Sequence, residues 1–102
     1  MNDPLQDIDD VVHQPARLGV LTILHETARA DFKFLRDSLE LTDGNLSRHL
    51  RVLEEAGLIE IEKGYEGRRP RTWVKITKAG RKALALEIAA LKQLVQRLEK
   101  NP

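Results

Sequence analysis

The sequence predicts a mainly α-helical fold with one small β-hairpin, an α+β arrangement, in a single domain spanning residues 1–102. Apolar residues recur at the 3.6-residue spacing of helices before residue 57 and again after residue 77. Two short runs between residues 58 and 76 instead carry an apolar residue at every second position, as strands do. With 41% hydrophobic residues in a chain of 102, we expect one modest core.

The composition excludes several classes of protein. The chain contains no cysteine, which rules out disulfides and thiolate metal sites. No apolar stretch approaches the roughly 18 residues that a membrane-spanning helix needs, and no charged-then-apolar leader is present. We therefore expect a cytoplasmic protein that does not enter a membrane.

The first third of the chain is expected to hold a flexible segment and two helices. Residues 1–10 are polar and acidic without periodicity, which predicts a flexible N-terminal segment. Pro15 suits the first position of a helix, and the apolar residues that follow it predict a helix to about Thr27. After a connector with one residue pair of strand, Asp31 can cap a second helix from Phe32 to about Leu39.

A third helix is predicted at about residues 43–56. Thr42 is a good N-cap residue, and Gly57 supplies the left-handed conformation that ends helices. Three leucines at helical spacing form its inward face: Leu46, Leu50 and Leu53. Two helices joined by such a short turn are typical of a helix-turn-helix.

The outward face of this third helix carries residues that contact nucleic acid in other proteins. Asn, Ser and Arg side chains hydrogen-bond base edges and phosphates, and a glycine lets the backbone approach a partner closely. The residues on this face are Gly44, Asn45, Ser47, Arg48 and Arg51. Taken alone, this face is equally well explained as an ordinary solvated surface.

A hairpin follows this helix. The two alternating runs cover residues 58–63 and 72–76, and the connection at 64–71 contains two glycines and a proline. We expect a flexible, positively charged loop there and not a tight two-residue turn. The basic residues of the loop are Arg68, Arg69 and Arg71. A helix followed by a hairpin with a basic tip predicts a winged helix-turn-helix.

The charge is distributed unevenly along the chain. Its net charge of +1 combines eight acidic and four basic residues before residue 43 with ten basic and six acidic residues over 43–82, and residues 83–102 add a net +1. A nucleic-acid partner requires a basic face and not a basic protein, since Lys and Arg replace counterions on phosphates. The basic segment coincides with the predicted third helix and hairpin.

Two strings in combination resemble the short MarR/ArsR-like winged-helix transcriptional regulators. They are TDGNLSRHLRVLEEAGLIE at residues 42–60 and GRRPRTWVKITKAGRKAL at residues 67–84, and the resemblance covers the chain from about Val11 to Leu84. It implies that the helix at 43–56 is a recognition helix that enters the major groove and that residues 64–71 form the wing. It also implies a transcriptional regulator, most often a repressor. Thiol and metal sensors of this group carry cysteines that are absent here, so an effector, if there is one, is unknown.

A long last helix is predicted at residues 78–100, capped by Thr77. Its apolar residues recur at alternating spacings of four and three, which is typical of a coiled-coil seam. The seam residues are Leu84, Ile88, Leu91, Val95 and Leu98. A helix of about 20 residues is roughly 30 Å long, longer than so small a core can cover. We expect it to be a dimerisation helix; the alternative is a helix packed wholly on its own domain.

Enzymatic chemistry is not expected. His13 is expected to be exposed, whereas His25 and His49 are expected to be half-buried structural side chains. Ser47 and His49 lie two apart on a helix and point in different directions, so they cannot act as nucleophile and base. The sequence therefore predicts no catalytic residue, no metal and no cofactor.

Two hypotheses remain for the function. The first is a homodimeric, sequence-specific regulator that binds double-stranded DNA, with two recognition helices in successive major grooves about 34 Å apart. The second is a winged-helix module for protein–protein interaction without specific DNA binding. An interaction module would be expected to show apolar anchors on the outward face of the third helix, where this chain shows Asn, Ser and Arg.

Overall fold

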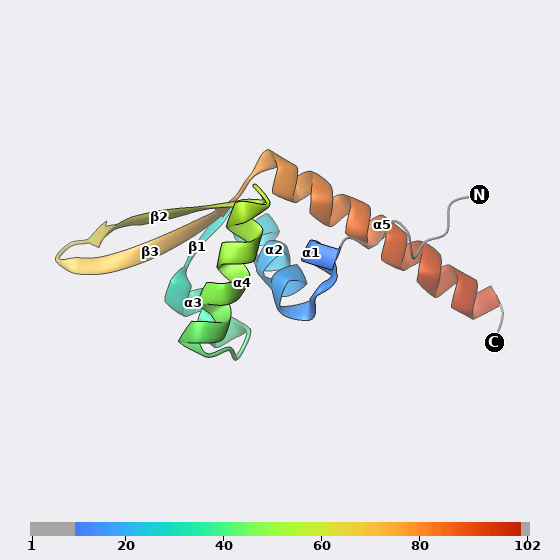
Figure 1. Cartoon of the computed structure of the whole chain (residues 1–102), viewed down its shortest axis with the longest axis horizontal. Helices are drawn as coiled ribbons and strands as arrows, with labels where there is room; N and C mark the ends of the chain where they lie inside the picture. The colour runs from blue at the N-terminus through green and yellow to red at the C-terminus, as the bar shows by residue number, and fades with distance from the viewer. Residues whose placement is uncertain (1–9, 101–102) are drawn as a thin grey trace.

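A computed structural model describes residues 10–100, and Figure 1 shows a β-hairpin and a long helix extending in opposite directions from a group of short helices. The principal extents of 57 × 25 × 21 Å reflect this elongated shape. The predicted flexible segment at 1–10 lies outside the described residues except for Asp10, which begins a helix. The elements in chain order are α1 (Asp10–His13), α2 (Pro15–Thr27), β1 (Arg29–Asp31), α3 (Phe32–Ser38), α4 (Asp43–Glu55), β2 (Ile59–Glu66), β3 (Arg69–Ile76) and α5 (Lys78–Lys100).

Local capping signals set the beginnings of three helices. The Gln14 side chain accepts hydrogen bonds from the backbone N–H groups of Ala16 and Arg17, at 2.7 and 3.1 Å, while Pro15 takes the first position of α2. Asp31 Oδ1 accepts from Phe34 N at 2.7 Å at the start of α3, as predicted. Thr42 Oγ1 accepts from Asn45 N at 3.1 Å at the start of α4, also as predicted.

The core lies where α2 and α4 meet the sheet. Leu21 and Leu24 of α2 and Leu46 and Leu53 of α4 are fully buried, and Val74 of β3 closes the core from the sheet side. The leucine face predicted for the third helix is therefore confirmed. Gly57 follows α4 with φ +76°, the left-handed conformation expected at this position.

The sheet is larger than the sequence predicts, and its hairpin is tighter. The strand order is β1-β3-β2, and β1 pairs antiparallel with β3 over three residues, Arg29 opposite Lys75 through Asp31 opposite Trp73. The expectation of a flexible loop at 64–71 was wrong, because β2 and β3 remain paired as far as Glu66 and Arg69. The turn consists of two residues, Gly67 and Arg68, and Gly67 has φ +64°. A glycine at the first central position is what a type II′ hairpin turn favours.

The sequence argument for a loop relied on Gly64 and Pro70, and the position of the hairpin explains why neither interrupts it. Beyond the three residues paired with β1, strand β3 has a neighbour only on its β2 side. Pro70, opposite Tyr65, therefore lies in an edge region of β3. A proline is tolerated there when the missing N–H would have pointed away from the neighbouring strand.

Helix α5 has the predicted bounds, and its two halves have different environments. In the first half, Gly80, Leu84, Glu87 and Ala90 are buried. Leu84, predicted to belong to a dimer seam, instead packs into the hydrophobic core of its own domain. Further along, Val95 and Leu98 are 52% and 65% exposed, so the described residues do not cover the far half (Figure 1). No helix among residues 10–100 is both long and apolar enough to cross a membrane.

Candidate nucleic-acid interface

The outward face of α4 brings all five predicted contact residues together. Gly44, Asn45, Ser47, Arg48 and Arg51 are all exposed, on the side opposite the buried leucines. Arg48 Nη2 donates a hydrogen bond to Asn45 Oδ1 at 3.2 Å. This bond joins two of the predicted residues one turn apart and limits the conformations that the Arg48 guanidinium samples before any partner is bound.

A basic residue on α3 neutralises the acidic start of α4. Arg36 Nη1 donates to Asp43 Oδ1 at 2.9 Å, and Arg36 Nε donates to Asp37 Oδ1 at 3.0 Å. These two hydrogen bonds raise the pKa of the Arg36 guanidinium above its ordinary value, and the bond to Asp43 has the larger effect. The pairing reduces the repulsion that Asp43 would exert on a phosphate near the helix start. No local pattern in the sequence indicates this ion pair, because Arg36 and Asp43 lie on different helices.

His49 lies half-buried at the edge of the leucine face, as predicted. Its Nδ1 atom is buried and has no hydrogen-bond partner among the described residues. Burial is the main cause that lowers the pKa of His49, and the positive charges of Arg17 and Arg48 lower it further. His49 is therefore a neutral packing side chain near neutral pH. His25, also expected to be half-buried, is instead exposed, with its Nδ1 atom 3.1 Å from Arg81 Nη1.

The three arginines predicted on the wing differ in their surroundings. Arg68 lies in the turn and Arg69 begins β3, and both are exposed. Arg71 is half-buried: its Nη1 donates to Asp31 Oδ2 at 2.9 Å, and its Nε lies 3.2 Å from Glu66 Oε2. Asp31 is also the N-cap residue of α3. Arg71 therefore ties the hairpin to the helix-turn-helix, whereas Arg68 and Arg69 extend from it.

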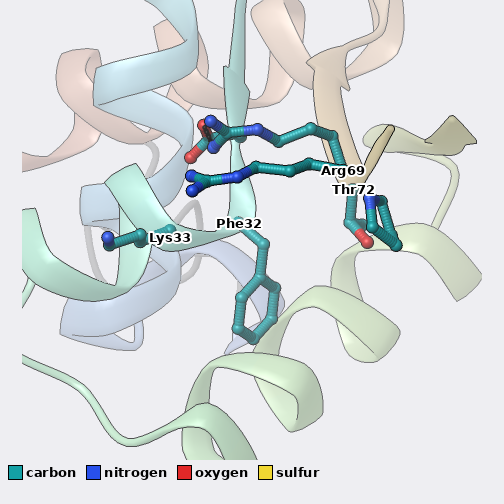
Figure 2. Close-up of a pocket in the computed structure, with 7 residues that line it drawn as sticks. Phe32, Lys33, Arg69 and Thr72 are labelled. Atoms are coloured by element: carbon teal, nitrogen blue, oxygen red, sulfur yellow. Dashed lines mark hydrogen bonds and ion pairs between the residues drawn. The ribbon is translucent and has the colours of Figure 1, made fainter. Parts of the chain in front are cut away.

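A shallow groove separates the start of α3 from the first residues of β3. It is lined by Asp31, Phe32 and Lys33 on one side and by residues 69–72 on the other, with a volume of about 340 Å³. Figure 2 shows the Arg69 side chain extending across this groove toward the helix that carries Lys33. The sequence alone did not single out Lys33, because no local pattern relates it to the wing.

The side chains of the described residues form no metal-binding group. Within residues 10–100, no three His, Cys, Asp or Glu side chains are grouped closely enough to hold a metal ion. The side chains gathered on α4 and the hairpin are arginines, an asparagine and a serine, which bind through hydrogen bonds and charge. Their arrangement is suited to recognition of a polyanion.

Comparisons with known proteins agree with this geometry. Residues 16–95 match the family model described as "Winged helix DNA-binding domain". An uncharacterized protein from Methanocaldococcus jannaschii is 36% identical over 89 residues, which cover 87% of this chain and 97% of that protein. The structure of a transcriptional regulator homologue from Pyrococcus horikoshii OT3 superposes with a TM-score of 0.88 at 34% identity, covering 95% of this chain and 98% of that one.

A solved complex also shares the fold. The transcriptional regulator MOSR of Mycobacterium tuberculosis, whose structure was determined with DNA, superposes with a TM-score of 0.72. The identity is 15%, and the match covers 95% of this chain and 69% of that one. At this identity the likeness concerns the arrangement of helices and strands.

Proposed function

Since the chain belongs to the winged helix DNA-binding domain family, we propose that it is a homodimeric transcriptional regulator that binds double-stranded DNA at specific sequences. The recognition helix α4 would lie in the major groove, and the β2–β3 hairpin would lie over the flanking minor groove or phosphates. We propose repression as its action, because a dimer bound at a promoter obstructs transcription without any further partner. No cofactor enters the mechanism, and the effector, if one exists, is unidentified.

The observation that carries this proposal is the division of α4 into two faces. Leu46, Leu50 and Leu53 are buried, while the opposite face presents to solvent a glycine, polar and basic side chains and, at its end, Glu55. A protein–protein interaction module would be expected to expose apolar or aromatic anchors on this face. The side chains present instead match the donors and acceptors that read base edges.

Within this face, Arg48 is best placed to read a base. It points away from the leucines near the middle of the helix, and its hydrogen bond to Asn45 holds the guanidinium over the outer surface. An arginine reads guanine through two parallel hydrogen bonds to O6 and N7, a geometry that lysine cannot reproduce. Ser47 and Arg51 would contact the neighbouring bases or phosphates.

Dimerisation would use the exposed part of α5. Ile88, Leu91 and Val95 line an apolar hollow of about 350 Å³ with the stems of Lys92 and Gln96. Leu98 continues the same face, and the side chains of Ile88, Val95 and Leu98 are 39%, 52% and 65% exposed. A second α5 packed along this face would remove these side chains from water. Leu84 is buried in the core of its own domain, so it would hold α5 in place without contacting the second protomer.

The test is a competition titration of Arg48→Ala and the parent protein against cognate and scrambled duplexes at one salt concentration. We expect Arg48→Ala to lose about one to two decades of affinity for the cognate duplex, as each 1.4 kcal/mol is about tenfold. Binding to the scrambled duplex should fall much less. Lys82→Ala, which removes one exposed charge outside α4 and the hairpin, is the matched control. Equal losses on both duplexes would make Arg48 a phosphate contact, and no binding to any duplex would refute the proposal.

A further inference from the structure

The groove between α3 and β3 carries more positive charge than its own residues neutralise. Lys33, Arg69 and Arg71 line it, against the single carboxylate of Asp31. That carboxylate is already used twice, since its Oδ2 accepts from Arg71 at 2.9 Å and its Oδ1 accepts from the N–H of Phe34 at 2.7 Å. Two of the three positive charges are therefore left without a counter-charge in the groove.

The two uncompensated cations come from elements that are far apart in the sequence but line the same groove. Lys33 lies in the first turn of α3 and Arg69 begins β3, and neither makes an ion pair among residues 10–100. Figure 2 shows the Arg69 side chain extending over the groove toward α3, while the Lys33 side chain points away from Arg69. Two like charges that line one groove repel unless an anion lies between them.

The walls of the groove are positioned firmly. Arg69 and Arg71 are two residues apart on β3, so their side chains leave the same face of the strand. Arg71 is fixed by Asp31 and Glu66 and forms the closed side of the groove, while Thr72 supplies a hydroxyl at its edge. Arg69 and Lys33 are both exposed, so both side chains are free to turn toward a ligand between them.

We propose that this groove binds one phosphoryl group, held directly by Arg69 and Lys33 and positioned by Arg71. The inference deepens the proposed function, since in the DNA complex the group would be a backbone phosphate beside the recognition helix. The same chemistry would also bind the phosphate of a free phosphorylated molecule. Arg69 thereby differs from Arg68, which lies in the hairpin turn outside the groove.

The first arm of the test uses duplexes in which a single backbone phosphate is replaced by an uncharged methylphosphonate. The parent protein should lose affinity at the phosphate that occupies the groove. Lys33→Ala and Arg69→Ala should both bind the unmodified duplex more weakly and should both lose their sensitivity at that same position. Arg68→Ala is the matched control and should keep the parent's sensitivity there. Full sensitivity of Lys33→Ala and Arg69→Ala at every position would overturn a clamp on DNA phosphate.

The salt dependence gives a second signature. Each neutralised phosphate contributes roughly 0.9 to the slope of log affinity against log salt. The double variant Lys33→Ala/Arg69→Ala should therefore lose about 0.9 per protomer, since the two residues share one phosphate, and a loss near twice that value would mean two separate contacts.

The second arm separates the two sources of the phosphoryl group. Inorganic pyrophosphate is titrated into the DNA-free protein while the Arg69 Nε–H and Lys33 backbone signals are followed by NMR. Saturable shifts in the parent and in Arg68→Ala, absent in Arg69→Ala, would support the groove as an anion site even if the protein bound no duplex. If the variants kept full methylphosphonate sensitivity and pyrophosphate caused no saturable shift, the phosphoryl site would be refuted. If the protein nevertheless bound duplex DNA in that case, the proposed DNA-binding function would still stand.

Discussion

Gly44 occupies the second position of α4, and nothing in the fold requires a glycine there. A Cβ atom built on Gly44 meets no other atom within 4 Å, and its φ lies outside the left-handed region. Replacing Gly by Ala inside a helix is worth up to about 1 kcal/mol, and less in the first turn. Gly44→Ala should therefore stabilise the protein by roughly 0.5 kcal/mol.

This gain converts into a measurable shift of the melting temperature. At roughly 2.1 cal/mol/K per residue, a chain of 102 residues unfolds with an entropy of roughly 0.2 kcal/mol/K. A stabilisation of roughly 0.5 kcal/mol then raises Tm by roughly 2 °C. Thermal unfolding followed by circular dichroism resolves a shift of this size.

DNA binding should change in the opposite direction. If α4 lies in the major groove, the exposed backbone of its first turn approaches the duplex, and an added methyl group prevents the closest contact. We expect Gly44→Ala to weaken binding to the cognate duplex by about tenfold, equivalent to about 1.4 kcal/mol. Thr22→Ala on α2, an exposed and uncharged position outside α4 and the hairpin, is the control and should stay within about twofold of the parent. A raised Tm with unchanged affinity would refute the close approach, and a lowered Tm would refute the described surroundings of Gly44.

Three further predictions concern the dimer, the fold and its pH dependence. Val95→Lys should give a monomer in sedimentation velocity. Leu86→Lys charges a similarly exposed position on a different face of α5 and should leave the dimer intact. If both variants remained dimeric, the interface would lie elsewhere. Gly80→Ala should cost about 1–3 kcal/mol or more in denaturant unfolding, since its Cβ would overlap the Leu58 carbonyl oxygen, and an unchanged midpoint would contradict this packing. Burial lowers the pKa of His49 in the folded protein, so the unfolded chain binds more protons as the pH falls. The contribution of His49 to the free energy of unfolding should therefore be fully present above about pH 6.5 and should decline below it. His49→Gln should flatten this decline, and an equal decline in the variant would assign it to other groups.

Local signals were sufficient to predict most helix boundaries. Thr42, Asp31 and Thr77 each accept a hydrogen bond from a backbone N–H three residues later, and Gly57 adopts the positive φ that its position predicted. Caps depend on a few adjacent residues and are therefore readable from sequence. The five residues predicted on the outer face of α4 follow from the same helical periodicity, which fixes their direction once the leucine face is known.

Contacts between distant elements were not predictable in this way. Asp31 and Arg71 are 40 residues apart, and the prediction that Arg71 is a DNA-contacting residue of the wing could not include a partner on β1. His13 was expected to be exposed near acidic neighbours; its side chain is 53% exposed, and its Nδ1 lies 2.9 Å from Oε1 of the buried Glu87, 74 residues away. Leu84 fits a coiled-coil spacing, but the same leucine belongs to the core of its own domain. Periodicity identifies an apolar face without saying what covers it.

The junction between α4 and α5 connects the two parts of the proposed mechanism. Thr77 N donates to Leu58 O at 3.0 Å, and Thr77 Oγ1 donates to Gly57 O at 2.7 Å while accepting from Gly80 N at 3.0 Å. The residues that follow α4 are thus hydrogen-bonded to Thr77, which caps α5, and Gly80 leaves no space between them. A rotation of α5 in a dimer would therefore carry α4 with it. It follows that the packing of the α5 seam would set the spacing between two recognition helices, whereas the outer face of α4 would set the bases that each one reads.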